Sequence, residues 1–366
     1  MKRNCFIFNI GGHYRKGIFQ ELDKDNNSDF YFGNKLKNPQ NVKKINYSLL
    51  KNFKSELENK YIFNKIYYQK NVVRLFFKPY KNYIIFSEYF NISTWLIILM
   101  SKFSRKKIFI WTHGWYGNEN FIKKIVKVIF FKLSDGIFVF GPRAKQYLSK
   151  YIKEDKIYII YNSLDYCKQI KVRNKLINNH LKFIKEPKNY NLIFVGRLMK
   201  RKKLHLLIKS INEIINQGIE VKLNLVGAGE DRARLESLTK KLNLNRYVKF
   251  LGEEYDENKL GELFFSSDLC ISPGSVGLTA IHSMMYGTPV ISHSDFKNQA
   301  PEYEAIVKNL TGDFFDFEIK NDLSNKIINW IQNQNRQTTR LHCFEMIDTY
   351  YNPSNQLKIL KESIKF

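Results

Sequence analysis

The sequence predicts an α/β protein built from two doubly wound domains, each a parallel sheet covered by helices. Short apolar runs bounded by turn residues alternate with segments of helical spacing along the chain. A polar, basic stretch at 165–188, ending in Glu186-Pro187-Lys188, divides this alternation into two halves and is the best linker candidate. The expected domains are residues 1–175 and 176–345, and residues 346–366 are expected to form a helix that packs back on the first domain.

The first half contains five predicted strands that are followed by turn or polar residues. They are Phe6–Asn9, Tyr83–Phe86, Ile108–Trp111, Gly136–Phe140 and Lys156–Tyr161. Residues Phe121–Leu133 have apolar residues at helical spacing with lysines between them, which predicts a helix. Residues 24–80 are rich in Lys, Asn and Tyr and show no clear period, so no element is assigned there.

The second half alternates more regularly between strands and helices. The predicted strands are Asn191–Val195, Val221–Val226, Val248–Leu251, Leu269–Ser272 and Pro289–Ser292. The predicted helices run from Leu204 to Gly218, from Asp256 to about Ser266 and from Leu278 to Tyr286, and a charged helix follows Gly229-Glu230. Two such domains are expected to face a cleft between the carboxyl ends of their sheets, where folds of this kind bind ligands.

The positive charge is concentrated in the first half of the chain. The 366 residues hold 60 Lys/Arg and 34 Asp/Glu, a net charge of +26. Residues 1–175 hold 34 of the basic and 12 of the acidic residues, so +22 of the net charge lies there. A surface of this sign attracts nucleic acid or anionic lipid. A compositional bias toward lysine is the alternative explanation, but it would not confine the charge to one half. No helix-turn-helix, zinc-finger or RNP-type sequence is found, which favours a membrane surface over nucleic acid.

Cysteine content and hydropathy indicate a cytoplasmic setting. The four cysteines lie far apart without a CxxC pair, which argues against a disulfide framework or a structural zinc site. The apolar runs Cys5–Ile10 and Trp95–Met100 are too short for a signal-peptide core and a membrane-spanning helix, respectively. We therefore expect a protein that is soluble or peripherally attached to the inner face of the cell membrane.

Two turns have the residue types that bind phosphate groups. At Gly196-Arg197, with Lys202 shortly after, a guanidinium and an ammonium group follow a strand and suit a diphosphate. At Ser275-Val276-Gly277-Leu278, small residues before a helix leave backbone N–H groups available to an anion. A solvated basic turn and an ordinary strand-to-helix turn are the alternative interpretations. Gly227-Ala228-Gly229 has only two glycines of a dinucleotide fingerprint and is interpreted as a plain turn.

In their order along the chain, these segments resemble the nucleotide-sugar domain of the GT-B glycosyltransferases, specifically the retaining group called family 4, or glycosyl transferases group 1. The resemblance covers about Asn191–Phe315. The matching motifs are G-R-L-x-x-x-K from Gly196 to Lys202, Gly227 and Gly229 after a strand, Phe250–Gly252, the Ser272-Pro273 turn, Gly277-Leu278, Gly287–Ile291, and Glu304 with Gly312. In the first half the matches are Gly11-Gly12 after the first strand, His113 at a strand end, and Tyr161-Asn162-Ser163.

One departure from the family pattern concerns its E-x7-E carboxylates. The aligned positions are Gly274 and His282, so both acids are missing and the chain resembles a divergent branch. In the family the first acid contacts the donor sugar and the second the ribose of the nucleotide. His282 could still form a hydrogen bond with a ribose hydroxyl, and Ser275 or a backbone N–H could take over the role of the acid that is missing at position 274.

The resemblance implies a glycosyltransferase that uses a UDP- or GDP-linked sugar and a saccharide or lipid-linked acceptor in the synthesis of bacterial capsule, lipopolysaccharide or O-antigen. It implies retention of configuration without a metal or other cofactor, because cationic side chains stabilise the departing diphosphate. Asp23-Lys24-Asp25 has the spacing of a metal-binding acid pair, but it is expected in a loop.

Site residues follow from the same resemblance. The implied catalytic residues are Arg197, Lys202 and His113, and the implied donor-binding residues are Gly11, Gly12, Gly196, Ser275, Val276, Gly277, Leu278, His282 and Glu304. His113 would contact the sugar, or act as a base if the reaction inverts. Glu88 is either a further acid in the cleft or a solvated helix cap.

Three questions remain open from the sequence. The chain could instead be a nucleotide-sugar epimerase of the same fold, or a non-catalytic protein that binds anionic lipid or nucleic acid. Helix Phe121–Leu133 could lie in a membrane interface or be a half-buried domain helix with a lysine face. Aromatic residues Trp111, Trp115 and Tyr116 flank His113 and could stack on a sugar or lipid, although core packing is expected for Trp111.

Overall fold

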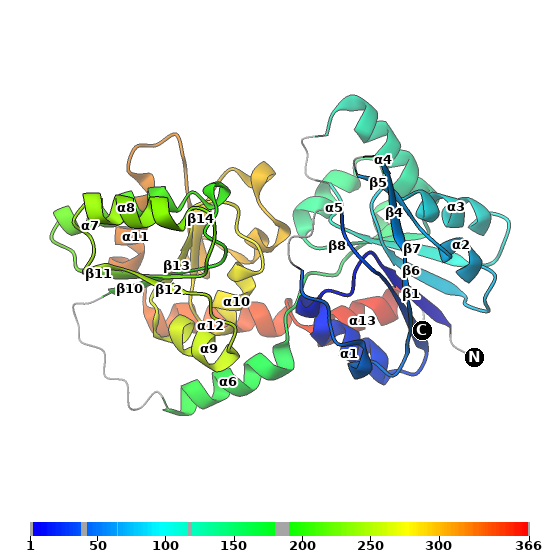
Figure 1. Cartoon of the computed structure of the whole chain (residues 1–366), viewed down its shortest axis with the longest axis horizontal. Coiled ribbons are helices and arrows are strands. Elements are labelled where there is room, and N and C mark those ends of the chain that lie inside the picture. The colour runs from blue at the N-terminus through cyan, green and yellow to red at the C-terminus, as the bar shows by residue number, and fades with distance from the viewer. Residues whose placement is uncertain (1–2, 38–41, 64, 116–118, 180–189, 365–366) are drawn as a thin grey trace. The chain divides into compact units, whose positions relative to one another are not determined.

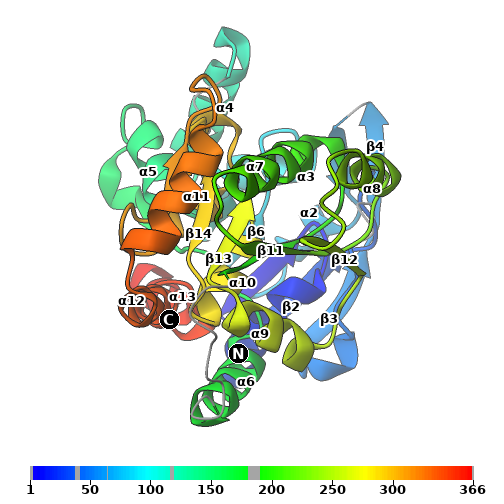
Figure 2. The same cartoon turned by 90° about the vertical axis from the view of Figure 1, so that its left-hand side faces the viewer.

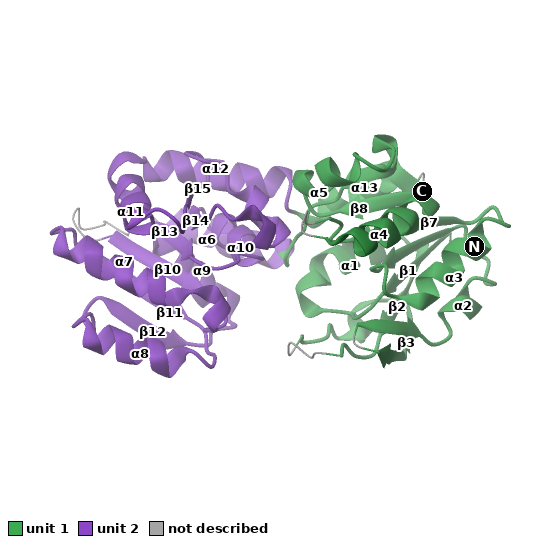
Figure 3. Ribbon diagram, turned by 90° about the horizontal axis from the view of Figure 1, so that it is seen from above, with its two compact units in different colours: residues 1–165, 352–366 green, residues 166–351 purple. Residues whose placement is uncertain are grey.

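The structure is a computed structural model, and it describes residues 3–37, 42–63, 65–115, 119–179 and 190–364. The chain divides into two compact units (Figure 3). Unit 1 consists of residues 1–165 and 352–366, and unit 2 of residues 166–351. The boundaries therefore lie at 165/166 and 351/352, whereas the sequence analysis placed them at 175/176 and 345/346.

Unit 1 contains a seven-stranded parallel sheet in the order β3-β2-β1-β6-β7-β8-β9. The strands are β1 (Asn4–Phe8), β2 (Ser28–Gly33), β3 (Phe53–Leu57), β6 (Asn82–Phe86), β7 (Lys107–Thr112), β8 (Gly136–Val139) and β9 (Ile157–Ile159). All five predicted strands are present. The stretch without a clear period holds β2 and β3, an antiparallel hairpin of β4 (Asn59–Phe63) and β5 (Ile66–Gln69), and helix α2 (Val72–Leu75).

The central strands β1, β6, β7 and β8 of the unit 1 sheet are buried on both faces, so they are mostly apolar. Alternate side chains of β1 enter two different clusters: Cys5 and Ile7 on one face, Phe6 and Phe8 on the other. Helices α3 (Ile92–Ser101), α4 (Phe121–Leu133) and α5 (Pro142–Leu148) cover the first face. Helices α1 (Lys16–Lys24) and α13 (Pro353–Ile364) cover the second face, where they lie side by side (Figure 1).

The C-terminal segment completes the core of unit 1. Leu360 and Ile364 of α13 are buried in the same cluster as Phe19 of α1. The Oγ of Ser163 donates a hydrogen bond of 2.6 Å to the side chain of Gln356 on α13. Removing α13 would therefore expose an apolar face of the sheet.

Unit 2 contains a six-stranded parallel sheet in the order β12-β11-β10-β13-β14-β15. The strands are β10 (Tyr190–Val195), β11 (Val221–Val226), β12 (Val248–Gly252), β13 (Leu269–Ser272), β14 (Val290–His293) and β15 (Gly312–Phe315). The strand order reverses between β10 and β13. In doubly wound sheets the carboxyl ends of the strands at this reversal mark the ligand site.

Helices lie on both faces of this sheet (Figures 1 and 2). One layer is formed by α7 (Leu204–Asn216), α8 (Arg232–Lys241) and α11 (Asp322–Asn333), whose apolar residues share one cluster with the strands. The other layer holds α6 (Tyr166–Asn179), α9 (Glu257–Ser266), α10 (Thr279–Met285) and α12 (Arg336–Thr349).

The prediction of a linker at 165–188 was wrong for its first part, because residues 166–179 form helix α6. In this helix Val172 is buried against Gly261 of α9, and polar contacts add to this packing. Arg173 forms a bidentate pair with Asp348 of α12 at 2.7 and 3.0 Å, and Gln169 donates to Glu257 of α9 at 3.2 Å. The Glu186-Pro187-Lys188 part of the predicted linker lies outside the described residues.

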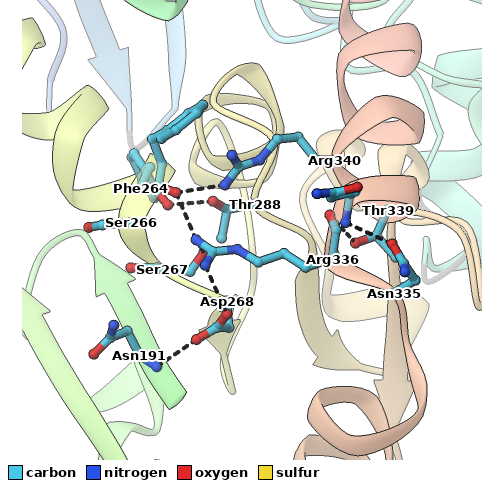
Figure 4. Close-up of polar contacts among 12 residues, drawn as sticks. Asn191, Phe264, Ser266, Ser267, Asp268, Thr288, Asn335, Arg336, Thr339 and Arg340 are labelled. Carbon is cyan, nitrogen blue, oxygen red and sulfur yellow. Dashed lines mark hydrogen bonds and ion pairs between the residues drawn. The ribbon is translucent and has the colours of Figure 1, made fainter. Parts of the chain in front are cut away.

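Two arginines of α12 fix the start of β13 (Figure 4). Arg336 donates to the carbonyl oxygens of Phe265 and Ser267 and pairs with Asp268, and Arg340 donates to Phe265 O at 2.7 Å. The guanidinium of Arg340 also lies 3.8 Å from the centre of the Phe265 ring. These contacts hold the strand whose carboxyl end leads into the small-residue turn.

Candidate functional site

The basic turn after β10 packs directly against the turn after β13. Lys202 lies in the 3-10 turn η5 (Lys200–Lys202), and its Nζ donates a hydrogen bond of 2.6 Å to the carbonyl oxygen of Ser275. Burial lowers the pKa of Lys202 to about 8, and the charge of Arg201 adds to this effect, while Glu302 opposes it. Lys202 is therefore a half-buried cation that joins the two turns, whereas Arg197 is exposed immediately after β10.

The same packing explains why a glycine, Gly274, occupies the first of the two positions at which the family has a carboxylate. A Cβ at Gly274 would lie 2.6 Å from the Cα of Lys202 and closer still to the carbonyl oxygen of Arg201. No side chain fits there unless the η5 turn moves away. The absence of an acid at position 274 is thus coupled to the close approach of η5.

The glycines at 227 and 229 also serve a close approach of two backbones. A Cβ at Gly227 would overlap the carbonyl group of Gly196, and a Cβ at Gly229 would overlap that of Leu198. This packing supports the interpretation of the segment as a plain turn.

A glutamine that the sequence analysis did not consider organises the turn before α10. The Oε1 of Gln299 accepts a hydrogen bond of 2.8 Å from the backbone N–H of Val276, and its Nε2 donates to Ser292 Oγ and to His293 O, each at 2.9 Å. The N–H of Val276 is therefore already occupied. The Oγ1 of Thr279, the first residue of α10, donates to the carbonyl oxygen of Val195 at the end of β10.

A buried acid beside this turn is Glu302, two residues before the predicted Glu304. Both lie in the 3-10 turn η7 (Pro301–Ala305), but Glu302 is 5% exposed and its Oε2 would be 3.8 Å from a Cβ placed on Gly277. Its charge also acts on Lys202. The spacing to Gly312 indicated Glu304, which is only partly buried. No local feature of the sequence distinguishes the two acids.

At the second position where the family has a carboxylate, the imidazole of His282 on α10 contacts the carboxylate of Glu257 on α9. The Nε2 of His282 lies 2.7 Å from Oε1 of Glu257, which also accepts hydrogen bonds from Tyr286 Oη at 2.7 Å and from Gln169 at 3.2 Å. Burial acts to raise the pKa of Glu257, but these hydrogen bonds and the charge of His282 outweigh it, and the pKa falls to about 2. Glu257 therefore stays ionised beside His282. No local sequence pattern marks Glu257, because its partner His282 is 25 residues away in the chain.

In unit 1, the carboxyl ends of β6 and β7 bring the predicted His113 and Glu88 together. The Nδ1 of His113 lies 3.6 Å from Oε1 of Glu88, and this oxygen also accepts a hydrogen bond of 2.8 Å from Thr112 Oγ1. The imidazole lies against the rings of Phe86 and Phe140, and 41% of the His113 side chain is exposed. His113 and Glu88 therefore lie side by side at the carboxyl ends of these strands, and part of the imidazole is exposed.

Arg15 is a cation near these carboxyl ends that the sequence analysis missed. It follows the Gly11-Gly12 turn, is 4% exposed, and its guanidinium lies 3.9 Å from the centre of the Phe86 ring. Four further rings lie within 5.7 Å of it, those of Phe8, Tyr14, Trp111 and Phe140. Cation–π contacts of this kind keep a buried guanidinium in place.

Two further expectations concern the aromatic residues and the acid pair. Trp111 is a core residue, 1% exposed, as expected, and Trp115 is also buried, whereas Tyr116 lies outside the described residues. The expectation that Asp23-Lys24-Asp25 forms a loop was wrong for Asp23 and Lys24, which lie in the last turn of α1. Asp23 accepts hydrogen bonds from the backbone N–H groups of Lys51 and Asn52. Among the described residues, no group of three His, Cys, Asp or Glu side chains could hold a metal ion.

Known proteins match this chain in the sequence of unit 2 and in the fold of the whole chain. Residues 177–341, nearly all of unit 2, match the family of glycosyl transferases group 1. Alr3699/HepE of Anabaena, solved in complex with UDP, has a TM-score of 0.72 and 14% identity, with 99% of each chain covered. The lipopolysaccharide outer core galactosyltransferase WaaB in its apo form has a TM-score of 0.70 and 16% identity, again with 99% of each chain covered.

The chain therefore has the GT-B fold expected from its sequence, and residues 177–341 match the family of glycosyl transferases group 1. A curated relative, the uncharacterized glycosyltransferase MJ1607 of Methanocaldococcus jannaschii, is 30% identical over 147 residues, which cover 38% of this chain and 37% of the relative. The alignment thus spans about a third of the length of this relative. Both units have the doubly wound α/β architecture predicted from the sequence.

Proposed function

We propose that the protein transfers a sugar from a nucleotide-diphosphate donor to a saccharide or lipid-linked acceptor. The proposal includes a role in bacterial capsule, lipopolysaccharide or O-antigen synthesis at the inner face of the cell membrane. The observation that carries it is the junction of Lys202, Ser275 and Glu302 at the reversal of strand order in unit 2, in the region that matches glycosyl transferases group 1. The UDP complex of HepE makes UDP the first nucleotide to test.

Arg197 and Lys202 would stabilise the negative charge that develops on the departing diphosphate. A pKa near 8 leaves the Lys202 ammonium largely protonated at neutral pH, so it can supply this charge. We propose that these cations suffice without a metal and that the configuration of the sugar is retained. Glu302 or Glu304 would hold a donor hydroxyl, and His113, positioned by Glu88, would contact the transferred sugar.

The test is a thermal-shift panel of UDP, GDP and their sugars on the full chain, followed by linkage analysis of the product with the best donor. At least one nucleotide should raise the melting temperature, and Arg197→Ala should remove the effect while the surface variant Arg232→Ala keeps it. A flat panel would favour a non-catalytic binding protein. Conversion of the donor sugar without transfer would favour an epimerase.

A further inference from the structure

Two neighbouring helices of unit 1 expose apolar stripes. On α3, Ile92, Leu96 and Leu99 are 37–48% exposed, and Phe103 just beyond the helix is 94% exposed. On α4, Phe121 and Ile122 are more than 70% exposed, and Ile125 and Ile129 are 43% and 46% exposed. Spacings of three, four and seven residues put each set on one side of its helix.

The buried sides of the same helices carry polar groups beside their apolar core residues, so these helices are apolar on both sides. On α3, Ser93 Oγ donates to Gln69 O, and Thr94 shares a hydrogen bond with Ser87. On α4, Lys127 is 5% exposed, and its Nζ lies 2.7 Å from Glu119 and 3.0 Å from Gly114 O. The lysine face considered for this helix is therefore partly turned inward, while isoleucines are turned outward.

The two stripes belong to one surface. Helices α3 and α4 cover the same face of the sheet and contact each other, and the rings of Trp95 and Phe130 lie 5.1 Å apart (Figure 1). We call the outward sides of these helices, with residues 102–107, the α3–α4 face. Exposed apolar side chains gathered on two neighbouring helices are typical of an interaction site.

The charges of the α3–α4 face have one sign. Residues 92–107 and 121–133 contain no acidic residue. Lys102, Lys123 and Lys132 are exposed among or beside the apolar side chains. Lysines around inserted apolar side chains are typical of surfaces that bind anionic bilayers. A second copy of the chain would place the same cations against each other, which disfavours self-association through this face.

We propose that the α3–α4 face docks on a bilayer that contains anionic lipid, with the isoleucine, leucine and phenylalanine side chains in the interface and the lysines at the headgroups. Within the part of the chain that the structure describes, no helix is long and apolar enough to span a membrane. The α3–α4 face would be the surface that binds the membrane in the proposed function, on which this proposal rests. Docking needs neither donor nor acceptor, so a failure to bind vesicles and a failure to transfer sugar can be distinguished.

The test is co-flotation of the full chain with vesicles of phosphatidylcholine, with or without phosphatidylglycerol. Binding should require phosphatidylglycerol and decrease with salt. The double variants Ile125→Ser/Ile129→Ser and Lys123→Gln/Lys132→Gln should each weaken binding by about tenfold or more. The matched controls in unit 2 replace exposed residues of the same kinds, Ile319→Ser/Leu341→Ser and Lys240→Gln/Lys241→Gln, and should bind as the unmodified chain does.

Each variant should keep the circular dichroism spectrum and melting temperature of the unmodified chain, because the replaced side chains are exposed. The proposal is wrong if the chain ignores anionic vesicles, binds both lipid compositions equally, or loses binding equally in the unit 2 controls. It is also wrong if the chain is a dimer that the isoleucine variant converts to a monomer, because the α3–α4 face would then bind a second copy.

Discussion

Replacing Glu257 by glutamine tests the cluster around His282 most directly. Glu257 accepts hydrogen bonds from Gln169 and Tyr286 and lies 2.7 Å from His282 Nε2, so three helices of unit 2 meet at one carboxylate. Glu257→Gln keeps the size of the side chain but removes its charge. We expect a folded protein with lower stability at neutral pH.

The size of the effect follows from the pKa of Glu257. A pKa lowered from 4.5 to about 2 corresponds to roughly 3 kcal/mol of stabilisation by the ionised form. Because the pKa is lower in the folded state, this stabilisation is fully present above the unfolded pKa and is lost as the pH falls toward 2. At pH 7, Glu257→Gln should therefore lower the free energy of unfolding by roughly 2–3 kcal/mol and the melting temperature by roughly 4–12 °C.

The assay is thermal unfolding of the unmodified chain and the variant between pH 7 and pH 2.5. The difference in melting temperature should be largest at pH 7 and shrink steadily below pH 5. Glu262→Gln is the control, because Glu262 is an exposed residue of the same helix α9. A difference that does not depend on pH, or equal stability at pH 7, would show that the ionised carboxylate does not hold these helices together.

Three further predictions concern the turns and the histidine. Lys202→Met should lower kcat/KM for transfer by about a hundredfold, measured by product formation, while Lys200→Met on the same turn should change it less than about threefold. Gly274→Glu restores the family carboxylate, but it should lower the free energy of unfolding, measured by chemical denaturation, by about 2 kcal/mol or more, because the new Cβ meets the backbone of Arg201. A stably folded variant with improved donor binding would contradict this prediction. His113→Asn should lower kcat but leave the affinity for the nucleotide alone unchanged, as checked by calorimetry, and a parallel loss of nucleotide affinity would place this side chain elsewhere.

Sequence patterns predicted strands that carry an uninterrupted apolar run, such as β6 and β13. Strand β2 escaped prediction although all its residues are buried, because it begins with Ser28-Asp29 and lies in a stretch rich in polar residues. Strand β3, Phe53–Leu57, lies at the sheet edge and is largely exposed, so its side chains carry no comparable signal. Helix α6 escaped prediction because most of its residues are polar and its buried residues are Gln169, Val172 and Arg173, only one of which is apolar.

The candidate site was predictable where a motif lies on one loop, as with Gly196-Arg197 and Lys202. The roles of Glu257 and Arg15 depend on contacts between separate elements, and no local pattern reports such contacts. The choice between Glu302 and Glu304 depends on which side of a single turn faces the fold. Spacing alone does not determine that side.

The return of α13 to unit 1 has a consequence for synthesis on the ribosome. Unit 2 is one continuous segment, 166–351, and can close its core as soon as that segment has emerged. Most of unit 1 precedes unit 2 in the chain, but unit 1 lacks Leu360 and Ile364 until the residues after unit 2 have been translated. The nascent chain would therefore carry an incomplete, basic first domain while the second domain is already folded. A stop codon shortly before residue 352 should leave an aggregation-prone product that depends on chaperones, not a functional shortened protein.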